Sequence, residues 1–213
     1  MRRATPLLTA ALALLAAACA ARSGVSLAPP LGAPAELGRW TLDGTGRWEV
    51  RDGLLVLTEK GTPAGAIRRP AALAILDGPP LRRATIRTGM RSTAPPTTLN
   101  RDLEVIFGYQ SPSRFYYVHL AGITDAAHNG IFLVADADRR RIDDGTAPPQ
   151  LRDVAWHDVR VERDGDSGLI EVYVDGAATP ALRAVDTTLP EGRVGVGSFD
   201  DTGEFRGISV TGR

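Results

Sequence analysis

The sequence predicts an all-β domain, built as a two-sheet antiparallel β-sandwich. Short runs rich in β-branched and aromatic residues recur along the chain, and Asp-Gly or Asn-Gly pairs lie between them. No segment combines the period and the caps of an amphipathic helix, since the Ala-rich stretch 64–76 is interrupted by Pro70. The Asp or Asn of the turn pairs stands at Asp43, Asp52, Asp77, Asn129, Asp144, Asp164 and Asp175. Such pairs adopt the backbone angles that tight reversals need.

The chain begins with a pattern typical of a secretory signal. A charged start precedes an apolar run over 6–18 that is too short to span a bilayer. The only cysteine, Cys19, follows three alanines, an order that resembles the lipobox of bacterial lipoproteins. We predict a signal peptide over 1–18 and lipidation of Cys19, which would anchor an extracytoplasmic protein in a bacterial cell envelope. The alternative is an ordinary cleaved signal with an incidental cysteine.

Composition excludes several classes of protein. Basic and acidic residues both number 25, so the formal net charge is zero and nothing favours binding to nucleic acid. A single cysteine cannot form a disulfide framework. The arginine run 139–141 is interpreted as solvated positions of a strand or loop. We expect the protein to contact the membrane through its lipid anchor only.

The chain is predicted to hold one folded domain behind a tether. Residues 19–36 are rich in Ala, Pro, Ser and Gly and lack an apolar period, as expected of a lipidated linker. The remaining residues, 37–213, suit one domain with a sizeable core. Strands are expected at the β-type runs 48–50, 54–58, 84–90, 103–110, 115–121, 131–135, 158–163, 169–175, 193–199 and 205–210.

The stretch 103–121 is predicted to form a hairpin whose two faces differ in chemistry. With the turn at 111–114, Gln110 pairs with Phe115 and Glu104 with Ala121. One face is apolar and must be buried, and it holds Leu103, Val105, Phe107, Tyr109, Tyr116, Val118 and Leu120. The other face is a polar stripe of Glu104, Gln110, Tyr117 and His119, with Gly108 beside Tyr117. We expect Gln110 and Tyr117 to be partly open to solvent.

A second hairpin supports the two-layer arrangement. Its turn lies within 164–168, and one face holds Val159, Val161, Ile170, Val172 and Val174. Polar and charged residues alternate with these on the other face. Two hairpins that are each apolar on one face need facing sheets, so the sequence favours a sandwich over a single open sheet.

Six segments of the sequence resemble the concanavalin A-like lectin/glucanase (laminin G-like) superfamily. They are Trp48-Glu-Val-Arg-Asp-Gly-Leu54, Phe107-Gly-Tyr-Gln110, Phe115-Tyr-Tyr-Val-His119, Trp156-His-Asp-Val-Arg160, Ile170-Glu-Val-Tyr-Val-Asp-Gly176 and Gly192-Arg-Val-Gly-Val-Gly-Ser-Phe-Asp-Asp-Thr-Gly-Glu-Phe205. The resemblance implies a jelly roll with one concave face, which the superfamily uses for carbohydrate binding, glycoside hydrolysis or polysaccharide lysis. The polar stripe would line that face.

Carbohydrate or polysaccharide recognition is the function that these patterns favour. Sugar rings stack on tyrosine, and sugar hydroxyls need fixed donors and acceptors. A ligand-binding role is therefore predicted for Glu104, Gln110, Tyr117, His119, His128 and Asn129. The last two join the stripe if the loop 122–127 folds over the sheet.

Two other classes of function stay open. Polysaccharide lyases of this superfamily move protons with Tyr and His, so Tyr117 and His119 are the catalytic candidates of an enzyme, either a lyase or a glycoside hydrolase. The Glu-x-Asp-x-x-Glu motif of family 16 endoglucanases is absent. A histidine that only forms hydrogen bonds within the sheet is the alternative for His119. The third class is a structural or protein-binding module of the envelope.

No cofactor is predicted, with a structural calcium ion as the exception that the resemblance allows. The acidic clusters are Asp200-Asp201 and Asp164-Gly-Asp166, and both are interpreted as turns because neither has a complete ligand spacing. His119 with His128 suggests zinc, but a third ligand at a defined spacing is missing.

Overall fold

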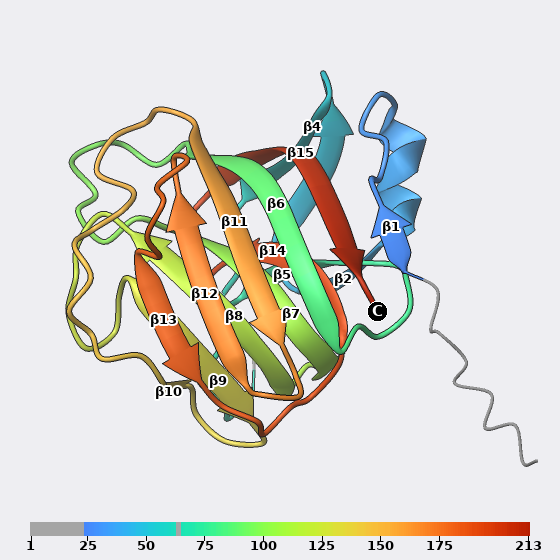
Figure 1. The fold of residues 1–213 in the computed structure, drawn as a ribbon. Coiled ribbons are helices and arrows are strands. Elements are labelled where there is room, and N and C mark those ends of the chain that lie inside the picture. The colour runs from blue at the N-terminus through green and yellow to red at the C-terminus, as the bar shows by residue number, and fades with distance from the viewer. Residues whose placement is uncertain (1–23, 63–64) are drawn as a thin grey trace, which may run out of the picture.

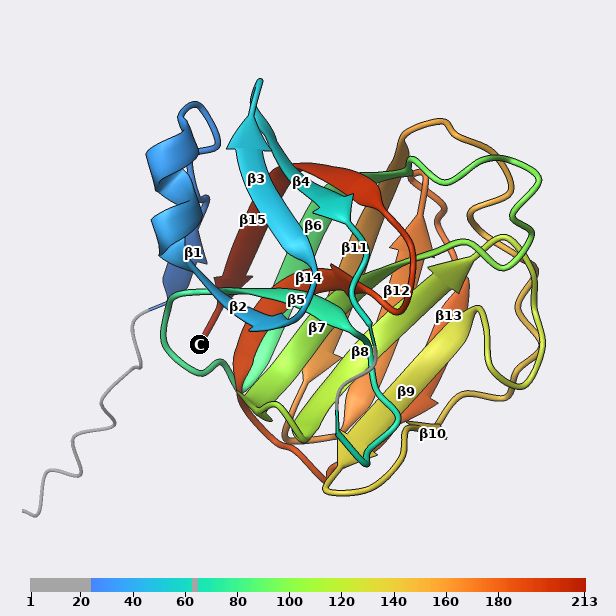
Figure 2. The same ribbon diagram turned by 180° about the vertical axis from the view of Figure 1, so that it is seen from behind.

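Two antiparallel sheets pack face to face in the computed structural model, which describes residues 24–62 and 65–213. The eight-stranded sheet lies in front in Figure 1, and the seven-stranded sheet lies in front in Figure 2. The order of the first sheet is β13-β12-β11-β6-β15-β4-β3, with β1 paired to β15, and that of the second is β10-β9-β8-β7-β14-β5-β2. The predicted all-β jelly-roll sandwich is confirmed.

The strands of the eight-stranded sheet are β1 (Val25–Leu27), β3 (Arg47–Arg51), β4 (Leu54–Glu59), β6 (Arg83–Ser92), β11 (His157–Asp164), β12 (Leu169–Val174), β13 (Leu182–Val185) and β15 (Gly203–Gly212). Those of the seven-stranded sheet are β2 (Trp40–Gly44), β5 (Ala72–Leu76), β7 (Asp102–Ser111), β8 (Arg114–Ala121), β9 (Gly130–Ala135), β10 (Arg140–Arg141) and β14 (Arg193–Ser198). A 3-10 helix, η1, spans Pro34–Arg39. All ten predicted runs form strands, whereas β1, β2, β5, β10 and β13 were not predicted.

The main core lies between the sheets and takes its residues from the faces that the sequence predicts. Val159 and Val161 of β11 face it with Ile170, Val172 and Val174 of β12, which is the predicted face of this hairpin. From the seven-stranded sheet, Phe107 stacks on Tyr116 with ring centroids 5.4 Å apart. The apolar faces of both predicted hairpins are therefore buried against each other, with one exception.

That exception is Tyr109, which a β-bulge turns to the opposite face. Ser111 pairs with Arg114 at the turn, as predicted, but beyond the bulge Glu104 pairs with His119 and not with Ala121. The backbone angle φ of Gly108 is +59° at the bulge, and a Cβ there would meet Tyr116 Cδ2 at 3.0 Å, so glycine is required. The pairing shifts by two residues, which preserves the face of every residue before the bulge.

The outer face of the seven-stranded sheet is covered, although the sequence predicted a partly open stripe. Ile106, Tyr109, Phe115, Tyr117 and Phe132 belong to a second apolar cluster on this face. Tyr117 is fully buried, so the prediction is wrong for it, whereas Gln110 is exposed as predicted. Ile67 packs against the cluster from a strap, residues 65–71, which crosses the sheet in Figure 2.

Two polar contacts hold the strap in place. The backbone N–H of Arg68 donates to Asp138 Oδ1 at 2.8 Å. The Arg69 guanidinium donates to both carboxylate oxygens of Asp43, at 3.0 and 2.8 Å, and both side chains are mostly buried. Tyr109 donates a further hydrogen bond to Asp43 at 3.2 Å. The bidentate ion pair fixes both distance and orientation.

The folded domain begins earlier than Leu37. Val25–Leu27 pairs with the last strand, and Leu31 is buried in the main core, so residues 25–36 belong to the domain and not to a tether. The predicted signal peptide and Cys19 lie outside the described residues. Among the described residues, no helix has the length and apolar character needed to cross a membrane.

Removal of the Phe107 ring tests the packing of β7. Phe107→Ala should lower the free energy of unfolding by about 3 to 5 kcal/mol, because it leaves a cavity between the sheets. Gln110→Ala, three residues along the same strand, should cost less than about 1 kcal/mol, because its side chain is exposed. Urea denaturation of both variants checks this. Equal losses would contradict the packing.

Candidate functional site

Four buried side chains and a partly buried arginine form a polar cluster at the outer face of the seven-stranded sheet. They are Asp102, Glu104, Tyr117, His119 and Arg139, and we call them the polar cluster. The pairing of β7 with β8 sets Glu104 opposite His119 and Ile106 opposite Tyr117. Side chains two apart on a strand share a face, so Asp102 joins Glu104. Arg139 reaches over them from the segment between β9 and β10.

Asp102 anchors the cluster to the neighbouring strand. Its Oδ1 accepts hydrogen bonds from the Ser198 hydroxyl at 2.6 Å and from the Phe199 N–H at 2.9 Å. Its Oδ2 lies 3.1 Å from His119 Nε2. Burial acts to raise the pKa of Asp102, but the neighbouring His119 imidazole and the hydrogen bonds from Ser198 and Phe199 hold it below its ordinary value.

His119 lies between Asp102 and Arg139. Its Nδ1 is 3.3 Å from Arg139 Nη1, and a guanidinium only donates, so we assign Nδ1 as the acceptor and place the ring proton on Nε2. Arg139 also donates to the Tyr117 hydroxyl at 3.0 Å. Burial, followed by the charge of Glu104, raises the pKa of Tyr117 well above its ordinary value.

Glu104 is the member of the polar cluster whose side chain lacks hydrogen-bond partners among the described residues. It is completely buried, and neither carboxylate oxygen has a hydrogen-bond partner among the described residues. Burial, with a smaller contribution from Asp102, raises the pKa of Glu104 well above its ordinary value. In this structure the surroundings of Glu104 therefore favour its protonated form, and a cation beside it would favour the carboxylate.

A layer of rings and guanidinium groups separates the cluster from solvent. The Phe199 ring lies parallel to the His119 ring at 6.1 Å, and Arg139 lies 4.1 Å from the centre of the Phe199 ring. Arg68 of the strap approaches the same ring at 5.7 Å. His119 is only 1% exposed as a result. A ligand from solvent therefore meets Arg139 before it meets His119.

The remaining predicted site residues lie at different distances from the cluster. The His128 ring is 5.5 Å from the His119 ring, and its Nδ1 bonds to Asp125 at 2.8 Å, so the loop does fold towards the sheet. Asn129 is completely buried, and its amide donates to three oxygens of neighbouring loops, which is a structural role. Gln110 lies at the turn end of the hairpin, where it donates to the Glu191 carbonyl.

Sequence reasoning missed two members of the cluster. Asp102 precedes Glu104 by two residues, so the alternation that selected Glu104 would have selected it as well. Arg139 belongs to a run interpreted as solvated, but Arg139 and Arg141 are partly buried and only Arg140 is exposed. No local signal distinguishes the three arginines.

Among the residues that the structure describes, two groups of side chains have the spacing to hold a metal ion. Asp102, Glu104 and His119 each place one ligand atom within 4.8 Å of the others, and Asp102, Asp200 and Asp201 do the same. Neither group contains His128, so the pair of His119 and His128 that suggested zinc does not share a group. Asp164 and Asp166 pair with Arg83, so they are occupied by ion pairs.

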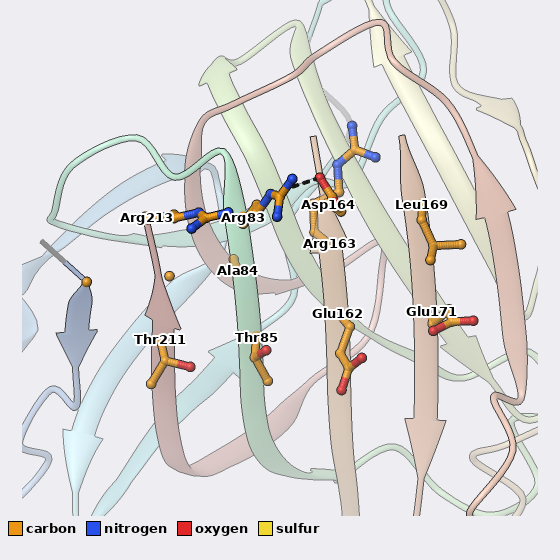
Figure 3. Close-up of a pocket in the computed structure, with 12 residues that line it drawn as sticks. Arg83, Ala84, Thr85, Glu162, Arg163, Asp164, Leu169, Glu171, Thr211 and Arg213 are labelled. Atoms are coloured by element: carbon orange, nitrogen blue, oxygen red, sulfur yellow. Dashed lines mark ion pairs between the residues drawn. The ribbon is translucent and has the colours of Figure 1, made fainter. Parts of the chain in front are cut away.

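The outer face of the eight-stranded sheet carries several hollows, and the lining of two of them bears on sugar binding. The one in Figure 3 is lined by charged groups that pair with each other, such as Arg83 with Asp164 at 3.2 Å, and none of its lining residues is aromatic. The other is lined by Arg160, Arg206 and Tyr173, and the Arg160 guanidinium lies 3.7 Å from the centre of the Tyr173 ring. Arg160 therefore already covers the ring that a sugar would need.

No protein-family model matches the sequence, and no curated protein matches it. Solved structures do share its fold. The winged bean acidic lectin, complexed with methyl-α-D-galactose, superposes with a TM-score of 0.59 at 12% identity, over 89% of this chain and 98% of the lectin. The carbohydrate-binding module CBM66 from Bacillus subtilis gives 0.54 at 15% identity, over 80% of this chain and 94% of the module.

A longer protein contains the same fold as one part of its chain. The GH43 protein BlXynB from Bacillus licheniformis gives a TM-score of 0.57 at 9% identity, over 82% of this chain but only 37% of that chain. These likenesses confirm the predicted concanavalin A-like β-sandwich. At such low identities they show the fold alone.

The buried carboxyl group of Glu104 should make stability depend on pH. The native state keeps this proton above pH 4.5, where the unfolded chain releases it, so native stability falls as the pH rises towards the raised pKa. Glu104→Gln is neutral at every pH. In a chelating buffer, its advantage over the wild type should grow by at most about 1.4 kcal/mol per pH unit above that point.

Urea denaturation of both proteins at about pH 5, 6 and 7 measures this difference. A difference that stays constant with pH would contradict a raised pKa of Glu104. It would mean that the native carboxylate is charged and balanced by a group within the site.

Proposed function

We propose that this domain recognises carbohydrate at the outer face of the seven-stranded sheet, around Arg139. The observation that carries the proposal is the polar cluster on that face. Burying ionisable groups costs stability, and clusters of groups with shifted pKa values occur preferentially at functional sites. The fold supports it by analogy, because a lectin and a carbohydrate-binding module have the same sandwich.

The buried residues and the partly exposed ones have different roles in this proposal. Arg139 and His128, whose side chain is 22% exposed, donate to sugar hydroxyls or to a sugar carboxylate. Tyr117 and His119 do not touch the sugar. Both contact Arg139 Nη1 and so fix the direction of its guanidinium group. Glu104 and Asn129 support this layer and do not touch the sugar, and Gln110 lies outside the site.

A carbohydrate-active enzyme is the second candidate, either a glycoside hydrolase or a polysaccharide lyase. It is favoured by the meeting of Tyr117, His119 and Glu104, an acid whose pKa burial raises, beside one guanidinium. It requires Arg139 and Phe199 to move, because they separate His119 from solvent. Turnover of a polysaccharide by the wild type, lost in His119→Gln with binding retained, would favour the enzyme over the binding module.

The protein would act at a bacterial cell envelope, outside the cytoplasm, held by lipid on Cys19. The support is the order of charged, apolar and small residues before that cysteine. An anchored carbohydrate-recognition domain would retain a polysaccharide at the cell surface, where it can be used.

Carbohydrate binding is tested with the full chain in detergent on a glycan array and a polysaccharide panel. Arg139→Ala should weaken binding to any recognised glycan by roughly 10- to 100-fold, because it removes a charged hydrogen-bond donor. Arg160→Ala is the matched control, since it removes an arginine that also covers an aromatic ring, on the other sheet. Its affinity should equal that of the wild type.

Two results would contradict the proposal. Loss of binding in Arg160→Ala alone would place the site on the eight-stranded sheet. Absence of binding to every glycan would instead favour a structural or protein-binding module.

The anchor is tested with Cys19→Ala in a bacterial host. The variant should leave the membrane fraction or fail to mature, because the thiol that accepts lipid is gone. Fractionation and intact-protein mass spectrometry measure both effects. A wild type without a lipid mass shift, together with unchanged fractionation of the variant, would exclude the anchor.

A further inference from the structure

We infer that Asp102, Glu104 and His119 bind one divalent transition-metal ion. Each residue offers one ligand atom, and these atoms lie within 4.8 Å of one another. Ligand atoms at 2.0 to 2.2 Å from a common ion are at most about 4.4 Å apart, so the three donors need little adjustment. All three side chains are buried, on adjacent strands of one sheet. This inference goes beyond carbohydrate recognition and does not depend on it.

The unpartnered oxygens of Glu104 are independent evidence for an ion. Both are buried, and neither accepts a hydrogen bond from a described residue. A buried carboxylate without a partner is costly. The charge of Arg139 acts on Glu104, but its Nη1 contacts Tyr117 and His119. A divalent ion would balance the two negative charges of Asp102 and Glu104.

The contact between His119 and Asp102 also fits two ligands of one ion. Nε2 and Oδ2 are 3.1 Å apart, yet Nε2 has no well-aligned hydrogen-bond partner among the described residues. Two atoms that point towards a common ion are close without being aligned with each other. Binding would move the ring proton to Nδ1, which requires the 3.3 Å contact with Arg139 Nη1 to open.

The mixed donor set selects the class of ion. Calcium takes six to eight oxygen ligands, whereas imidazole with carboxylates suits zinc, iron and manganese. Asp200 and Asp201 are partly exposed, and with Asp102 they form the second group of donors. They would attract the ion at the surface and pass it to the buried site, which gives the site an entry path.

The test titrates the metal-free full chain with Zn²⁺, Mn²⁺ and Ca²⁺, by calorimetry and by thermal unfolding. We expect Zn²⁺ or Mn²⁺ to bind one per chain and to raise the Tm, and Ca²⁺ to have no effect at equal concentration. Glu104→Gln and His119→Gln should each weaken the ion by at least about 100-fold, since losing a direct ligand exceeds the loss of a supporting contact. X-ray absorption should detect a nitrogen ligand that His119→Gln removes.

The matched control is His157→Gln, because His157 also lies between two carboxylates, at 2.9 Å from Asp175 and 3.1 Å from Asp153. Ion binding should be unchanged in this variant. Glu104→Gln keeps the shape of the side chain, and its Tm without metal shows whether it folds. The inference is overturned if no ion binds the wild type, if only Ca²⁺ binds, or if a folded Glu104→Gln keeps the wild-type affinity. Loss of binding in His157→Gln alone would overturn it as well.

Discussion

The candidate site depends on the pairing of Glu104 with His119 across β7 and β8. A regular hairpin with the same turn would set Glu104 opposite Ala121. The side chains of Glu104 and His119 would then be offset by two residues along the strands. The bulge at Gly108 absorbs two residues of β7 and brings them together. The other contacts of the polar cluster depend on this pairing, because it places His119 beside Asp102 and Arg139.

The cover over this site has a physical cause. The outer face of the seven-stranded sheet also carries apolar residues near the hairpin turn, where Phe115 and Tyr109 lie. A sheet with two apolar faces must bury both, so another segment has to cross it. Ile67 supplies the apolar contact, and the Arg69 ion pair with Asp43 fixes the segment to β2. The polar cluster is buried because it lies next to a surface that has to be covered.

The sequence predicts the parts of this structure that follow from short-range alternation. The faces of Phe107, Val118 and Val172 could be assigned because each belongs to a run with period two. β5 could not, since its alanines carry no strand signal and its burial between β14 and β2 is a tertiary effect. The bulge could not be predicted either, because a glycine in a strand marks several different irregularities.

The sequence predicts which residues share one face at the candidate site, but it does not predict that they are buried. Glu104, Tyr117 and His119 do share one face, and His128 does approach them. Their burial depends on the strap and on Phe199, which lie about 40 residues before the hairpin and 80 after it in the sequence. No window of local sequence contains that information. Arg139 was missed for the same reason, because its neighbours along the chain do not show that it crosses two aromatic rings.

The proposals for carbohydrate and for a metal ion meet at Arg139. One guanidinium nitrogen contacts both Tyr117 and His119, so the ring proton of His119 decides whether that contact is favourable. An ion on Nε2 would place the proton on Nδ1, facing a donor, and Arg139 would be released towards solvent. A sugar that binds Arg139 would in turn relieve this repulsion. Because such coupling is reciprocal, each ligand would change the affinity for the other by the same factor.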